Sequence, residues 1–218
     1  MTKTVAVLGG TGNEGPGLAL RWAKSGKYNV IIGSRQAEKG QRVADELNQR
    51  LGQNLIRGMS NEDAARQADL CVLTVPYAAQ EPTLKALRDV LQGKVLVNVT
   101  VPLKPPKVSH VHIPPGGSAG EEAQAVLGDG VKVVSAFQNV GAAHLADDEG
   151  RIECDVLVCG DDKAAKQEAI ALAEAAGMRG IDAGPLKNSV VVEGLTSILI
   201  GINIRHKVKG AGIKITGI

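Results

Sequence analysis

The stretch Thr4–Gly15, TVAVLGGTGNEG, determines the fold class of this chain. Its apolar run Val5–Leu8 has the length and β-branched content of a buried strand, and apolar residues at helical spacing follow the glycines. Gly10, Gly12 and Gly15 form a G-x-G-x-x-G pattern between the predicted strand and the predicted helix. A strand-turn-helix with this glycine spacing predicts a dinucleotide-binding turn, whereas a purely structural strand-helix turn is the alternative.

Each glycine of this pattern has a physical role in such a turn. Gly10 allows the tight turn, Gly12 lets the backbone approach a pyrophosphate, and Gly15 lets the helix pack close to the strand. The free N–H groups and the dipole of the helix then face the phosphates.

The second predicted strand ends in residues that favour NADP over NAD. Enzymes specific for NAD usually place an acidic residue here, where it binds the ribose 2′-hydroxyl. This chain has Ser34 and Arg35 instead, with Lys39 four residues beyond Arg35. A hydroxyl and two cations suit a 2′-phosphate, which an acid would repel. The alternative is that Arg35 and Lys39 are a solvated pair at the start of a helix.

Strand and helix patterns alternate along the chain, which predicts an α/β fold with a doubly wound parallel sheet of the Rossmann type. We expect the sheet to be complete near residue 140, with an NADP-binding domain at 1–140 and a smaller C-terminal α/β domain at 141–218. The predicted strands are Val5–Leu8, Asn29–Ser34, Asn54–Arg57, Leu70–Val75, Lys94–Val99, Val131–Ala136, Cys154–Cys159 and Met178–Ala183. The predicted helices between them include Ala37–Leu51, one capped by Ser60, one beginning near Pro82, Glu121–Leu127, Asp161–Ala176 and Asn188–His206.

Composition narrows the class of protein. Aromatic residues make up 2% of the 218 residues and the formal charge is +2, so neither stacking platforms nor strong basicity indicates a nucleic-acid partner. Three cysteines argue against a disulfide framework, and no signal peptide is recognisable, so we expect a cytoplasmic protein. Glu193 and Asn203 interrupt the apolar segment Asn188–His206, which argues against a membrane span and favours a buried helix or a dimer seam.

Two segments carry excess positive charge. The Pro- and Gly-rich stretch Leu103–Gly117 predicts a long loop, either functional or disordered, with lysines but no acids. The chain after Glu193 also has no carboxylate side chain, which predicts an anion site or a solvated end. His110 and His112 have no evident third ligand, so we expect no metal site.

Several short sequence motifs together resemble those of the NADPH-dependent reductases of the deazaflavin coenzyme F420. They keep their order over almost the whole chain: Leu8–Gly15 (LGGTGNEG), Gly33–Arg35 (GSR) with Lys39, Met59–Ala64 (MSNEDA), Leu73–Tyr77 (LTVPY), Val133–Phe137 (VVSAF), Val158–Asp162 (VCGDD) and Asp182–Leu186 (DAGPL) with Asn188 and Ser189. The resemblance implies a Rossmann domain, a small C-terminal domain, a homodimer, and a deazaflavin bound in the cleft beside NADP.

The resemblance also implies roles for individual residues. Thr11, Gly12, Asn13 and Glu14 would hold the pyrophosphate, beside Gly10 of the turn, and Ser34, Arg35 and Lys39 the 2′-phosphate. Tyr77, Val101 and Ala142 would line the nicotinamide and its ribose, while Pro102, Gln138 and Ala211 would border the deazaflavin. Gln138 stands where His is common in the family; glutamine can still bond a ring carbonyl but cannot carry charge or relay a proton.

The implied reaction is direct hydride exchange between the nicotinamide and the deazaflavin, for which the cofactors carry the chemistry. It requires no catalytic side chain, and the sequence shows no convincing nucleophile, Ser-His-Asp set or metal cluster. The alternatives are an NADPH-dependent flavin or ferric reductase and a non-catalytic NADP-sensing module. The acidic tail of the deazaflavin would suit Lys104, Lys107 and the cationic C-terminus.

Overall fold

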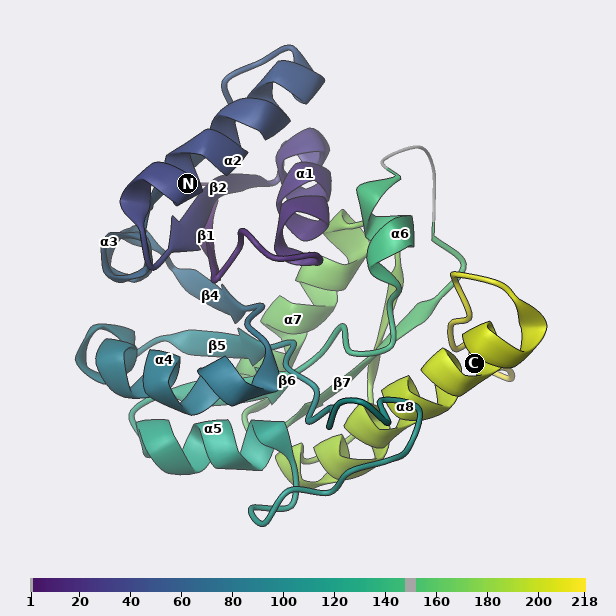
Figure 1. Ribbon diagram of the computed structural model, residues 1–218. Coiled ribbons are helices and arrows are strands. Elements are labelled where there is room, and N and C mark those ends of the chain that lie inside the picture. The colour runs from purple at the N-terminus through teal and green to yellow at the C-terminus, as the bar shows by residue number, and fades with distance from the viewer. Residues whose placement is uncertain (1, 148–151) are drawn as a thin grey trace.

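The computed structural model describes residues 2–147 and 152–218, which form an eight-stranded sheet with helices on both faces (Figure 1). The strand order is β3-β2-β1-β4-β5-β6-β7-β8; β6 and β7 pair antiparallel and the other neighbours pair parallel. The strands are β1 (Lys3–Leu8), β2 (Tyr28–Ser34), β3 (Ile56–Ser60), β4 (Leu70–Leu73), β5 (Val95–Asn98), β6 (Lys132–Ser135), β7 (Asp155–Gly160) and β8 (Arg179–Asp182).

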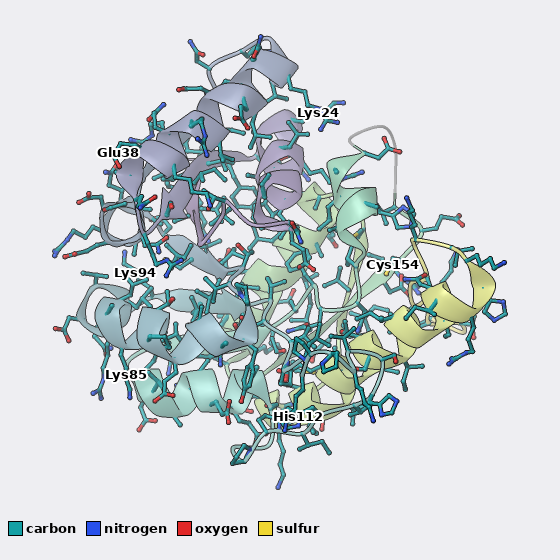
Figure 2. The ribbon with its side chains drawn as sticks, in the orientation of Figure 1. Lys24, Glu38, Lys85, Lys94, His112 and Cys154 are labelled. Atoms are coloured by element: carbon teal, nitrogen blue, oxygen red, sulfur yellow. The ribbon has the colours of Figure 1, made fainter. Side chains whose placement is uncertain are left out.

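Three of the helices begin at a side chain that caps them. Ser60, Ser118 and Asp162 each accept a hydrogen bond from the backbone N–H three residues later, which satisfies a free donor of the first turn. The helices are α1 (Gly15–Ser25), α2 (Ala37–Leu51), α3 (Asn61–Gln67), α4 (Tyr77–Leu91), α5 (Ala119–Leu127), α6 (Ala142–Ala146), α7 (Lys163–Ala175) and α8 (Ser189–His206), with a 3-10 turn at Leu186–Asn188. Charged side chains such as Lys24, Glu38 and Lys85 project outward from these helices (Figure 2).

Alternate residues of β1 divide the core into two layers. Val5 and Val7 pack with buried residues of α1, α2 and α7, whereas Ala6 and Leu8 pack with those of α3, α4 and α5. A strand buried on both faces is what a parallel sheet requires. The predicted doubly wound α/β fold is therefore confirmed.

Three details differ from the sequence prediction. The sheet does not end near residue 140, because β7 pairs with β6 and β8 extends it further. The third strand begins at Ile56, two residues later than predicted. Pro82 lies inside α4 rather than in its first turn, because Pro76 ends the preceding segment and the helix begins immediately at Tyr77.

Helix α8 is neither wholly buried nor wholly apolar. Val192, Glu193 and Ser197 are buried, whereas Val191 and Ile198 are 65% and 46% exposed. The Glu193 carboxylate accepts hydrogen bonds from the N–H groups of Ala119 (2.7 Å) and Gly120 (3.0 Å), so it holds α8 against the start of α5. Among the described residues, no helix combines the length and apolar character needed to cross a membrane.

Candidate functional site

Two adjoining hollows lie at the carboxyl ends of the parallel strands, where ligands bind in such sheets. The larger has a volume of about 600 Å³ and the smaller about 500 Å³. Both are bordered by Gly12 and by Thr74–Pro76, which follow β4. A ligand that passes over Gly12 can therefore occupy both hollows.

The glycine turn is built for close approach. Gly9 has a φ of 68°, and its N–H donates to Asn61 Oδ1 (3.0 Å), which fixes the turn. A Cβ on Gly15 would lie 2.6 Å from Gly10 Cα, so this glycine is required for α1 to pack on the turn. A Cβ on Gly12 would meet no atom closer than 3.8 Å, so the space above Gly12 is open toward the hollows.

The N-terminus of α1 offers free backbone donors. No side chain caps it, and its first turn contains no acidic residue. Unsatisfied N–H groups at a helix N-terminus attract anions, and phosphates are the commonest of these.

The smaller hollow collects the residues predicted for a 2′-phosphate. Thr11, Ser34, Arg35 and Lys39 line it, together with Asn61, which was not predicted. Ser34 is buried at the end of β2, while Arg35 and Lys39 are exposed and form no ion pair with a described residue. Two unpaired cations beside a buried hydroxyl provide an anion site of the predicted kind.

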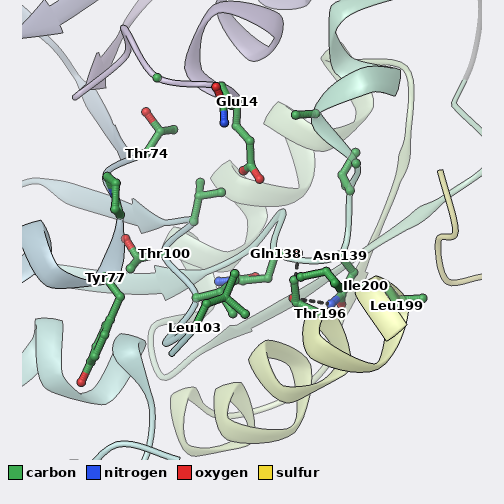
Figure 3. A pocket seen from close by; sticks show the side chains of 18 of the residues that line it. Glu14, Thr74, Tyr77, Thr100, Leu103, Gln138, Asn139, Thr196, Leu199 and Ile200 are labelled. Carbon is green, nitrogen blue, oxygen red and sulfur yellow. Dashed lines mark hydrogen bonds between the residues drawn. The ribbon is translucent and has the colours of Figure 1, made fainter. Parts of the chain in front are cut away.

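The larger hollow collects most of the other predicted residues. Those that line it are Gly12, Asn13, Glu14, Tyr77, Val101, Gln138, Ala142 and Ala211. Pro102 and Gly10 are buried and do not line either hollow, although Val101 and Leu103 on each side of Pro102 do. Figure 3 shows this hollow between the glycine turn and α8.

Gln138 lines the larger hollow and carries a buried acceptor. Its Nε2 donates to the backbone oxygen of Asn98 (2.8 Å) and to Ser135 Oγ (2.7 Å), and a carbonyl oxygen can only accept, so the orientation of the amide is determined. Gln138 Oε1 is left buried without a hydrogen-bond partner among the described residues. A buried unpartnered acceptor is costly, and a donor that reached it would relieve this cost.

Asn139 repeats this arrangement one residue later. Its Nδ2 donates to the backbone oxygen of Val192 (2.9 Å) and to Thr196 Oγ1 (3.2 Å), and Asn139 Oδ1 is the second buried acceptor without a described partner. Phe137 precedes the pair with a φ of 73°, which is uncommon for an aromatic residue, and its ring packs edge-on against Trp22. This turn directs Gln138 and Asn139 toward the site, and such strained backbone is concentrated at functional sites.

Two ionisable side chains line the larger hollow. The Tyr77 hydroxyl donates to a Glu122 carboxylate oxygen (2.8 Å); burial and this bond raise the pKa of Tyr77 to about 12, so the phenol stays neutral. Burial raises the pKa of Glu14 to about 7. Figure 3 shows the Glu14 side chain reaching from the glycine turn into the hollow.

The far wall of the hollow comes from the C-terminal part of the chain. Ala211 is placed there because its N–H donates to Asn203 Oδ1 (2.9 Å) on α8, and the following segment is held by Asp155, whose carboxylate bonds the Ile215 N–H (2.6 Å) and Arg179. His110 and His112 lie on the loop between β5 and α5, outside both hollows. The described part of the chain holds no group of three or more side chains suited to a metal ion.

Comparison with known proteins gives a consistent result. Residues 4–102 match the family model of coenzyme F420-dependent NADP oxidoreductases. The chain is 45% identical to the F420-dependent NADP reductase of Methanocaldococcus jannaschii, over 98% of each chain. The chain belongs to the family of F420-dependent NADP reductases.

Two further comparisons agree. The F420-dependent NADP reductase of Methanothermobacter thermautotrophicus is 40% identical over 100% of this chain and 97% of its own. The crystal structure of a candidate F420-dependent NADP-reductase from Arthrobacter sp. FB24 has a TM-score of 0.80 and 27% identity, covering 98% of this chain and 99% of that chain. The resemblance predicted from the sequence is thus confirmed.

Several lining residues were missed by the sequence analysis. Thr74 and Thr100 follow β4 and β5, and the rule that ligands bind at the carboxyl ends of strands was sufficient to find them. Five more come from α8 and from the turn after β6, which reach the site only through tertiary packing: Asn139, Thr196, Leu199, Ile200 and Asn203.

Proposed function

We propose that this enzyme transfers a hydride between NADP(H) and the deazaflavin coenzyme F420. NADP would extend through both hollows, and the deazaflavin ring would lie beside the nicotinamide in the larger one. The observation that carries the proposal is the larger hollow, which is lined both by the glycine turn and by two residues with unpartnered amide oxygens, Gln138 and Asn139. The family of the chain supports both cofactors.

The residues present suit NADP. The open space above Gly12 and the uncapped start of α1 would receive the pyrophosphate, and Arg35, Lys39 and Ser34 the 2′-phosphate. The nicotinamide would then extend past Gly12 into the larger hollow, beside Tyr77, Val101 and Ala142.

The residues present also suit a heterocycle that carries N–H groups. Because the Nε2 of Gln138 is already bonded, this side chain offers only an acceptor, and its partner on the ligand is an N–H rather than a ring carbonyl. Asn139 Oδ1 offers a second acceptor. When both cofactors are bound, their rings supply the hydride chemistry, and the protein supplies proximity, orientation and exclusion of water.

The test mixes purified protein, NADPH and oxidised F420, and follows the visible absorbance of the deazaflavin. Bleaching that NADH does not support is the expected result. No bleaching with NADPH binding intact, or bleaching of FMN or FAD alone, would contradict the proposal. The 45% identity to an F420-dependent NADP reductase favours the deazaflavin over the flavin or ferric alternatives.

The proposal includes a homodimer formed through α8. Val191 and Ile198 are two helical turns apart, so they lie on the same exposed face, and Val111 of the adjoining loop is 48% exposed. Exposed apolar clusters mark interfaces, and a second copy of the same face is the simplest complement. We expect Val191→Glu with Ile198→Glu to yield monomers in analytical ultracentrifugation; an unchanged mass would contradict this interface.

The two-part organisation of the chain also belongs to the proposal. Residues 1–140 would carry the NADP site, and residues 141–218 would supply α8, which walls the deazaflavin side. The three cysteines are buried and free, which fits a reducing compartment such as the cytoplasm.

A further inference from the structure

Glu14 is a partly buried acid to which the described residues give no partner. It lies in the glycine turn directly before α1, and its carboxyl neither caps that helix nor bonds to any described residue. Among the described residues that line the larger hollow, it is the only one that carries a full charge when ionised at neutral pH. The residue is partly exposed, so its proton can exchange with solvent.

Burial is the only cause of the raised pKa of Glu14, and no charged side chain contributes to it. Three ionisable side chains on α4, α1 and α6 have other partners. Tyr77, on α4, donates to Glu122. Arg21, on α1, donates to backbone oxygens that include those of Ala176 (3.0 Å) and His144 (3.1 Å). The His144 ring on α6 is bonded to the Gly210 oxygen (3.0 Å). No positive side chain in the described lining is therefore available to balance an ionised Glu14.

The position of Glu14 relative to the two hollows indicates which part of a bound dinucleotide lies beside it. The predicted 2′-phosphate site lies in the smaller hollow, and Gly12 borders both. A dinucleotide with its adenosine end there and its pyrophosphate over Gly12 has its other end in the larger hollow. Glu14 lines the larger hollow and not the smaller one (Figure 3). Its carboxyl therefore faces the nicotinamide half, and only its backbone is left for the pyrophosphate contact that the family resemblance implies.

The nicotinamide ring changes charge in the reaction. The ring of NADP⁺ is a cation, and hydride addition makes the ring of NADPH neutral. All other charges of the nucleotide, including the phosphates, are the same in both forms. A carboxylate near the ring therefore distinguishes the two forms, whereas a carboxylic acid hardly does.

We propose that Glu14 is a proton-linked counter-ion that senses the redox state of the bound nicotinamide: it is ionised beside NADP⁺ and takes up a proton from solvent beside NADPH. This inference rests on the proposed function for the orientation of the nucleotide. The partial removal of Glu14 from water raises its pKa to about 7, which places the exchange at neutral pH. Rising pH thus favours bound NADP⁺, and falling pH favours bound NADPH.

The test measures the dissociation constants of NADP⁺ and of NADPH by calorimetry from pH 5.5 to 8.5, in two buffers of different ionisation enthalpy. The ratio of the NADP⁺ constant to the NADPH constant should fall with rising pH, by on the order of 10- to 100-fold, for a charge pair at short range in a partly polar site. Near pH 7, NADP⁺ binding should release more protons than NADPH binding.

Glu14→Gln and Glu14→Met should each remove the pH dependence of this ratio, whereas Glu46→Gln on the exposed face of α2 should keep it. The wild-type proton release tests the inference even where a variant is poorly folded. A ratio that does not change with pH in the wild type, or that changes equally in both Glu14 variants, would overturn it. That result can coexist with normal bleaching of F420; absent nucleotide binding or absent bleaching instead contradicts the proposed function.

Discussion

The hydrogen-bonded acid Glu193 makes the stability of the fold depend on pH in a predictable direction. Burial raises the pKa of Glu193 to about 7, although the N–H groups of Ala119 and Gly120 act in the opposite direction. In the unfolded chain the pKa of this group should lie near its ordinary value of 4.5. Between these two values the folded state holds more protons than the unfolded state, so stability falls as pH rises.

The size of the effect follows from the shift. A pKa raised from 4.5 to about 7 corresponds to roughly 3 kcal/mol, present in full below the unfolded value and lost as pH rises through the folded value. In Glu193→Gln the amide cannot ionise, so this part of the pH dependence disappears. The NH₂ of the introduced glutamine faces one of the two backbone N–H donors, and this lowers the free energy of unfolding by about 1–3 kcal/mol at every pH.

The assay is urea unfolding of the wild type and of Glu193→Gln at pH 5, 6, 7 and 8. Relative to the wild type, the variant should become more stable by about 2.5 kcal/mol between pH 5 and pH 8, because part of the effect is already lost at pH 5 and ordinary carboxyls cancel in the difference. Glu46→Gln, which removes an exposed carboxyl from α2, is the control. A stability difference that is the same at all four pH values would refute the reasoning.

Three further predictions concern the site. Arg35→Ala should raise the KM for NADPH roughly 10- to 100-fold, because it removes charged hydrogen bonds to the 2′-phosphate, while the KM for NADH stays unchanged; an unchanged NADPH-to-NADH preference in steady-state kinetics would place that phosphate elsewhere. Gln138→Met, which removes the unpartnered acceptor, should weaken F420 binding about tenfold in fluorescence titrations, and equal weakening of NADPH would argue against its role beside the deazaflavin. Lys104→Gln with Lys107→Gln should raise the KM for F420 several-fold and reduce its dependence on salt, without an equal change for NADPH.

The layers of the fold were predictable because the apolar pattern of each segment matches the way the segment packs in the structure. The strand Val5–Leu8 is apolar at every position, and the sheet buries both of its faces. Ser60 and Ser118 mark helix starts by the same hydrogen bonds that stabilise these starts. The addition of β7 and β8 to the sheet was not predictable, because an antiparallel junction between β6 and β7 depends on how distant segments meet.

The nucleotide side of the site was more predictable than its partner side. The turn around Gly12 and the end of β2 at Arg35 are short contiguous segments. Within each of them, the residues that line the hollow are also close together in the sequence. The opposite wall is assembled from the turn after β6 and from α8. Gln138 Oε1 is the amide atom without a hydrogen bond because Gln138 Nε2 donates to the Asn98 carbonyl oxygen, which lies 40 residues away in sequence.

Removal from water raises the pKa of both Glu14 and Glu193, but the consequences for the protein differ. Burial raises the pKa of both carboxyls to about 7. Glu193 has two backbone donors within the fold, so its ionisation changes stability and contributes to the docking of α8. Glu14 has no such donor and opens onto the larger hollow, so the cost of its charge is relieved only when a cation enters. Because Glu193 does not line the hollow, Glu193→Gln should change unfolding but leave the NADP⁺-to-NADPH affinity ratio as dependent on pH as in the wild type, and Glu14→Gln should abolish that dependence.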